Sequence, residues 1–186
     1  MLREAPAKAV MSRSKRVDRR EIAGEFERVR ADFHRLVADA SSEGFDRPSS
    51  GTRWRNEQLL FHMVFGSMVV RPLLSLVRIF GRPPEGVSRR FAAAQNASTR
   101  LFDEVNYRGT CQTARVFDRH RMVRHCDKVI DALLRSLAAG AESDLQRGMH
   151  FPDRGDPFFA DYMTLEDLYR CPARHFDFHR RQLTPD

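Results

Sequence analysis

Hydrophobic residues first recur with a helical period between Asp18 and about Ser41. The apolar positions in this stretch are Ile22, Phe26, Val29, Phe33, Leu36 and Val37. Their spacing places them on one face of a helix, and charged residues fill the opposite face. The pattern predicts an amphipathic helix that ends at the Ser-Ser-Glu-Gly run at 41–44.

A second helix is predicted over about residues 56–80, the most hydrophobic part of the chain. Within it, the 22 residues from Leu59 to Phe80 approach the length of a membrane span. Arg71 and Arg78 argue against a span, because each would cost about 2.5 to 3.5 kcal/mol at the centre of a bilayer. We therefore expect a helix buried on several sides of a soluble bundle, kinked near residues 68–71 because Pro72 removes a backbone donor.

Two more long helices are predicted in the second half of the chain. One covers about residues 115–139, and Gly140 is a natural C-cap for it. The other covers about residues 164–183 and opens with Thr164 and Asp167, which have the spacing of a capping box.

The segments between these helices are longer than a simple up-down bundle needs. Residues 88–106 predict only a short helix, followed by a break at 107–109, and residues 148–163 predict a loop packed down by its aromatic side chains. No strand pattern of any length is present. The fold class predicted is all-α, a four-helix bundle with a long crossover between its second and third helices.

The size and the cysteine content of the chain fit one reduced, soluble domain. A chain of 186 residues can bury a core without disulfides. The three cysteines are scattered and have no CxxC spacing, which favours thiols in a cytoplasm over a disulfide framework.

The net charge of +7 belongs mostly to the N-terminus. Residues 1–20 carry seven basic and two acidic side chains, so the other 166 residues carry only +2. We expect a basic, disordered tail at 1–17 and a single helical domain at 18–186. The predicted domain has no electrostatic footprint for nucleic acid, so a nucleic-acid partner is not expected.

His175 and His179 lie four residues apart in the last predicted helix. This spacing puts two imidazole rings on one face, one turn apart, so that both can reach a single cation. Two unrelated surface or core histidines would show the same spacing.

His62 lies in the most hydrophobic helix, where an unpaired polar ring is costly to bury. A metal bound to one of its nitrogens would resolve that cost, and so would a hydrogen bond to a backbone carbonyl or to Asp127. Gly66, one turn later, is expected to leave open space beside the ring. The residues alone leave both interpretations open.

Two motifs in the chain resemble those of the DinB-like superfamily of metalloenzymes. One is Leu-Leu-Phe-His-Met at 59–63, shortly after Trp54. The other is His-Phe-Asp-Phe-His-Arg-Arg-Gln-Leu at 175–183. By the order of its elements, the resemblance covers about residues 20–183.

This resemblance implies a four-helix bundle in up-down-down-up order, with a divalent metal, usually zinc or nickel, held by His62, His175 and His179. Some relatives are transferases or isomerases that use a low-molecular-weight thiol, bacillithiol or mycothiol, and maleylpyruvate isomerase is among them. Three histidine ligands leave a position for water or substrate, as catalytic zinc sites do.

Four further residues are candidates for supporting roles. Cys171 shares a face with His175 and is either a fourth ligand or a buried small side chain. Gln182 extends that face, and Asp127 and Asp131 are candidate acceptors for the ligand rings. The remaining histidines are interpreted as surface or loop residues: His34, His120, His125 and His150.

Two functions of different classes follow from these patterns. The first is a metal-dependent transferase, isomerase or hydrolase, whose metal activates water or a thiol for reaction with a small molecule. The second is a non-catalytic bundle, with a structural metal or none, that acts in dimerisation or partner binding. A cytoplasmic location is expected for both, and the apolar second helix would suit a homodimer.

Overall fold

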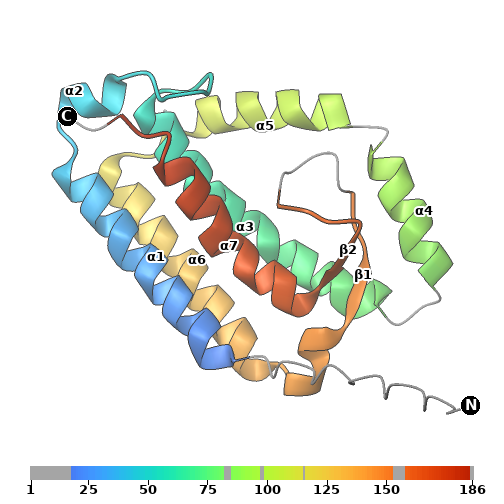
Figure 1. Cartoon of the computed structure of the whole chain (residues 1–186). Helices are drawn as coiled ribbons and strands as arrows, with labels where there is room; N and C mark the ends of the chain where they lie inside the picture. The colour runs from blue at the N-terminus through green and yellow to red at the C-terminus, as the bar shows by residue number, and fades with distance from the viewer. Residues whose placement is uncertain (1–17, 82–84, 97–98, 115, 153–157, 185–186) are drawn as a thin grey trace, which may run out of the picture.

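Helices dominate the structure (Figure 1), which confirms the all-α prediction. The structure, a computed structural model, describes residues 18–81, 85–96, 99–114, 116–152 and 158–184. The predicted basic tail at 1–17 lies outside these residues. The elements are α1 (Arg19–Asp39), α2 (Ser42–Asp46), α3 (Asn56–Phe80), α4 (Glu85–Asn96), α5 (Thr99–Ala114), α6 (Arg119–Ala139), the 3-10 helix η1 (Glu142–Gln146), β1 (Gly148–His150), β2 (Tyr162–Thr164) and α7 (Leu165–Arg180).

The four long helices α1, α3, α6 and α7 form the central bundle, in which α1 and α3 each pack against both α6 and α7. Side-chain contacts give their directions. Helix α1 runs parallel to α7, because Glu21 contacts Arg170 and Arg28 contacts Asp177; α3 runs parallel to α6, because Met68 contacts His125 and Arg78 contacts Ser136. Helix α1 runs antiparallel to α6, through Arg30–Asp131 and Ala40–Arg119. Helix α3 runs antiparallel to α7, through His62–His175 and Arg78–Tyr169. Along the chain the helices therefore run up, down, down and up.

The long helices bury the faces that the sequence pattern predicts. In α1, Ile22, Phe26, Val29, Phe33 and Val37 are all at most 5% exposed. Full burial of one such side chain contributes about 1.5–3 kcal/mol. The hydrophobic effect along this face thus fixes which side of α1 meets the rest of the bundle.

The hydrophobic helix α3 lies inside the bundle. By length and hydropathy it is the one described helix that could cross a membrane, yet half of its most hydrophobic window is buried within the protein. Arg78 bonds to the Tyr169 hydroxyl at 2.9 Å and to the Ser136 hydroxyl at 3.0 Å. The helix is continuous through Pro72. It therefore behaves as the core helix of a bundle.

The crossover between α3 and α6 contains α4 and α5, which lie outside the four-helix bundle (Figure 1). The predicted break at 107–109 is wrong, because α5 continues to Ala114. The Tyr107 ring lies 6.1 Å from the Trp54 ring. The Arg53 guanidinium lies over the Tyr107 ring, 3.8 Å from the centre of that ring. Such contacts outweigh the cost of about 1 kcal/mol that Gly109 imposes on a helix.

A short hairpin interrupts the segment that was predicted to be a loop. Strands β1 and β2 pair antiparallel, with Met149 opposite Met163. The prediction that no strand is present was wrong, because three-residue strands are too short to show a period of two. Gly148 is needed here, since a Cβ atom would lie 2.7 Å from the Met163 carbonyl oxygen.

Two helix ends have the caps that the sequence predicts, at Thr164 and at Gly140. The Thr164 side chain accepts a hydrogen bond from the Asp167 backbone N–H. The Asp167 carboxylate accepts one from the Thr164 backbone N–H at 3.0 Å, so the capping box is confirmed. Gly140 follows the last residue of α6, as predicted. Asp18 caps α1 through its side chain.

Candidate metal centre

Three histidines meet where α3 packs against α7. His62 belongs to α3, and His175 and His179 lie one turn apart on α7. One nitrogen of each ring lies within 4.8 Å of the other two. All three residues are at most 8% exposed. The structure thus brings together the three residues that the sequence singled out.

The register between α3 and α7 is held by an asparagine at the start of α3. The Asn56 amide nitrogen donates to the Gly44 carbonyl at 2.7 Å and to the Thr184 carbonyl at 2.9 Å. The backbone N–H of Thr184 donates back to the Asn56 side-chain oxygen at 3.2 Å. These bonds fix the end of the chain beside α3, which places His179 opposite His62.

The spacing of the rings fits a divalent ion. The Nε2 atoms of His62 and His175 are 3.3 Å apart. Zinc binds histidine nitrogen at about 2.0–2.1 Å, so two nitrogen ligands of a tetrahedral zinc ion are about 3.3 Å apart. Three converging imidazoles also form a donor set that zinc and nickel accept.

Burial keeps the rings in the neutral form that binds metals. Burial, together with the nearby His179, lowers the pKa of His62 to about 3. The pKa of His175 is well below its ordinary value because of burial and of its two histidine neighbours. Burial also lowers the pKa of His179, although a hydrogen bond from its ring to Gln182 opposes this.

Two ring nitrogens of the cluster lack hydrogen-bond partners among the described residues. They are the buried Nδ1 atoms of His62 and His175. A buried polar atom without a partner costs about 1–3 kcal/mol. A cation held by the Nε2 atoms would leave both Nδ1 atoms protonated and still without an acceptor, so these two atoms do not by themselves indicate a metal.

Gln182 orients the third ring. Its side-chain oxygen lies 2.6 Å from His179 Nδ1, and because an amide oxygen only accepts, Nδ1 carries the proton. The Nε2 atom of His179 then has the lone pair that a metal needs. This is the outer-shell arrangement that fixes the tautomer of metal-binding histidines.

Close packing fixes the other two rings. Trp54 stacks on His62 with ring centres 4.3 Å apart, and Phe158 meets His175 edge to face at 5.9 Å. The open space expected beside Gly66 is instead filled by the His175 ring, since a Cβ atom on Gly66 would lie 2.4 Å from its Cε1 atom. A glycine is therefore required where α7 brings His175 against α3.

Comparison with known proteins assigns this chain to a family. A sequence model of the DinB superfamily matches residues 25–183, which include all three histidines. The chain belongs to the DinB superfamily. No curated protein and no solved structure matches it. In this DinB-superfamily chain, the buried histidine group can hold a metal ion.

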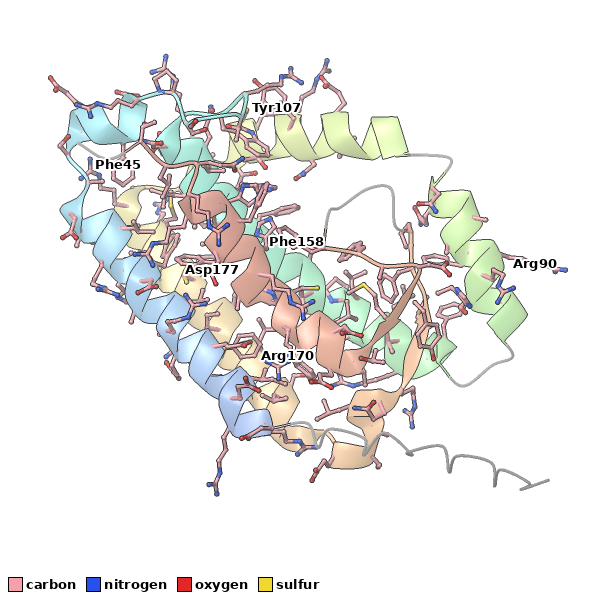
Figure 2. All side chains as sticks on the ribbon, viewed as in Figure 1. Phe45, Arg90, Tyr107, Phe158, Arg170 and Asp177 are labelled. Atoms are coloured by element: carbon pink, nitrogen blue, oxygen red, sulfur yellow. The ribbon has the colours of Figure 1, made fainter. Side chains whose placement is uncertain are left out.

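A cavity of about 210 Å³ adjoins the histidines of this DinB-superfamily protein. His62 and His175 form part of its wall, together with side chains from α3, α4, α5, α7 and the hairpin segment. Phe158, labelled in Figure 2, is one of these wall residues. A ligand in the cavity would therefore lie against two of the three histidines.

Of the candidate supporting residues, Cys171 lies beside the three histidines, whereas Asp127 and Asp131 do not bond to them. Cys171 is buried and lines the cavity, but it is not part of the histidine group. Asp127 bonds instead to His34 at 2.8 Å, and Asp131 bonds to Arg30. The predicted roles of both aspartates are wrong, because their side chains on α6 pair with α1.

The remaining histidines lie outside the group formed by His62, His175 and His179. His120 is exposed, but His150 is 7% exposed, so its interpretation as a surface or loop residue is corrected. The Nδ1 atom of His150 lies 3.2 Å from an Asp161 carboxylate oxygen. Its place in a three-residue strand gave no sequence signal of burial.

Sequence reasoning missed the part of the cavity wall that comes from the crossover. Phe91 on α4 and Asn106 on α5 line the cavity beside His62. Nothing in their local pattern indicates this, because their position depends on how the crossover folds back over α3.

Proposed function

We propose that this protein is a metal-dependent enzyme that acts on a small molecule, with zinc or nickel held by His62, His175 and His179. The convergence of three buried, neutral imidazoles beside a cavity carries this proposal. Catalytic zinc sites commonly have three protein ligands and one open position.

The residues around the proposed site would each have a defined task. Trp54 and Phe158 exclude water from the rings, and Gln182 holds the tautomer of His179. A bound metal would lower the pKa of a water molecule or of a thiol. His62 and His175 would present that position to the cavity.

The residues that line the cavity favour chemistry with a thiol cosubstrate over hydrolysis. No Asp or Glu is found among the described residues that line the cavity, so no carboxylate stands ready as a general base for water. A thiol bound to such a metal would lose its proton outright to solvent, so thiol chemistry would need no such base. We therefore propose transfer or isomerisation with a low-molecular-weight thiol, such as bacillithiol or mycothiol.

The proposed setting is the cytoplasm. Cys111, Cys126 and Cys171 remain thiols, as in proteins of a reducing compartment. A homodimer remains a prediction.

Elemental analysis of the purified protein tests the proposed metal site. We expect about one zinc or nickel per chain, and we expect its loss in the His175→Ala, His179→Ala double variant. His120→Ala, at an exposed position on α6, is the matched control and should retain the metal. If the parent binds no metal after reconstitution with zinc and with nickel, the catalytic proposal fails and a non-catalytic bundle is favoured.

The thiol is tested separately, by adding cysteine as a probe to the nickel-loaded protein. A new absorption band from a thiolate-to-nickel transition would support a thiol cosubstrate. An unchanged spectrum in the metal-loaded protein would count against it while leaving the metal site standing.

A further inference from the structure

The cavity beside the histidines is suited to a neutral, largely apolar molecule. Its walls include Phe65, Leu73, Phe91, Phe151 and Phe159. None of the described lining residues is Asp, Glu, Lys or Arg. An apolar cavity of about 150 Å³ already holds a benzene ring, so about 210 Å³ has room for a larger ring system.

One polar group in this wall lacks the partner that its burial requires. Asn106 projects from α5 into the lining, and its side-chain oxygen is buried with no hydrogen-bond partner among the described residues. An amide oxygen can only accept, so a donor must come from the contents of the cavity. A carbonyl oxygen left without a donor costs about 1–3 kcal/mol, which favours a ligand that supplies one.

We propose that the substrate of this site is a neutral aromatic or aliphatic ring compound whose single N–H or O–H group donates to Asn106. This inference rests on the proposed function and defines the substrate class of that site. The apolar body would fill the space between α3, α4 and the hairpin segment, with one edge against His62 and His175.

Asn106 then acts as a specificity-determining residue. A site that hydrogen-bonds a donor discriminates against the analogue without it, since the buried acceptor is then left unpaired. An anionic ring compound would find no compensating cation among the described lining residues and would bind less well.

Calorimetric titration with indole and with benzofuran tests the proposal. The two probes have nearly the same shape, but only indole carries a donor. We expect the metal-loaded full chain to bind indole about tenfold more tightly than benzofuran. Equal affinities, or no binding of either probe, would overturn the proposal.

Variants of residues in the cavity wall test whether Asn106 causes the preference for indole. Asn106→Leu should keep benzofuran binding and lose the preference for indole, and a preference that persists would overturn the role of Asn106. Val69→Phe, which narrows the cavity from the α3 side, should weaken the binding of indole and of benzofuran equally. Unchanged binding in a folded Val69→Phe protein would show that the probes bind elsewhere, and the proposal would fail.

The variant His179→Ala separates this inference from the proposed function, because His179 is not among the described lining residues. The variant should lose the metal and keep the indole preference. A parent that prefers indole but holds no metal would refute the proposed function alone. A parent that holds metal but shows no preference would refute the substrate class alone.

Discussion

Gly66 and Gln182 determine where two of the three histidine rings lie, although neither belongs to the histidine group itself. Gly66 provides the space that the His175 ring occupies, and Gln182 accepts a hydrogen bond from His179. Residues of this kind affect metal affinity through the position and tautomer of a ligand. Two predictions follow at this scale.

Gly66→Ala should displace the His175 ring, because the new methyl group would lie 2.4 Å from its Cε1 atom. We expect zinc affinity to fall by about 10- to 100-fold, measured by competition with a chromogenic chelator. Gly24→Ala on α1 is the matched control, since nothing lies within 4 Å of its Cβ position. The control should bind zinc normally and be more stable by about 0.5–1 kcal/mol. Normal zinc binding by Gly66→Ala would contradict the close approach of the ring.

Gln182→Leu should remove the acceptor that fixes the tautomer of His179. The expected loss in zinc affinity is again about 10- to 100-fold, with little change in helix content. Gln112→Leu, at an exposed position on α5, serves as the control. Equal affinities of the two variants would show that the hydrogen bond does not support the site.

At the residue scale, the sequence predicts short-range relations well and long-range contacts poorly. The spacing of His175 and His179 within one helix is a local property, and the structure retains it. The space beside Gly66 and the partner of Asp127 depend on which helices become neighbours. Local patterns carry no information about those contacts.

Charged side chains hold α1 and α7 side by side along their length. Arg170 bonds to Glu25 at 2.9 Å and to Glu21 at 2.7 Å near one end of the contact, and Arg28 bonds to Asp177 farther along. Figure 2 shows Arg170 and Asp177 on the side of α7 toward α1. Because α7 carries two of the histidines, this contact also positions the proposed site.

Asp32 is the most buried charge in this contact, at 5% exposure. Its carboxylate accepts from Arg35, from Arg180 at 2.8 Å and from Arg28 at 3.4 Å. Asp32→Asn should lower the free energy of unfolding by about 1–3 kcal/mol. This is less than a fully buried pair would lose, because all three arginines are partly exposed. Urea unfolding beside the exposed control Asp39→Asn measures this difference. A loss no larger than that of the control would contradict it.

The elements themselves were predictable in proportion to their length and their burial pattern. The helix expected at about 18–41 is found as Arg19–Asp39, because its apolar face is long and regular. The helix α5 was cut short in the prediction, since Gly109 is a local signal and the contacts of Tyr107 are not. Strands of three residues left no pattern to detect.

The stability of the whole molecule should depend on pH through its buried histidines. The pKa of His62 in the folded state is about 3, and in the unfolded chain it is about 6.5. Between these values the unfolded chain binds more protons than the folded protein does. The free energy of unfolding therefore falls as the pH drops through this window.

In the metal-free protein, each histidine that stays neutral in the folded state should lower the free energy of unfolding by about 1.4 kcal/mol for every pH unit below 6.5. Urea unfolding between about pH 7 and pH 5 measures this slope. His62→Leu should make the slope shallower, whereas His120→Leu should leave it unchanged. Identical slopes in His62→Leu and the parent would refute the contribution of His62.

The placement of α4 and α5 outside the bundle separates two tasks within one chain. The bundle helices α3 and α7 hold the histidines, while the crossover supplies Phe91, Gln95 and Asn106 to the cavity wall. These three side chains can thus be exchanged without replacing any of the three histidines. For protein engineering, they are positions at which a library could change the cavity wall while the histidine group stays the same.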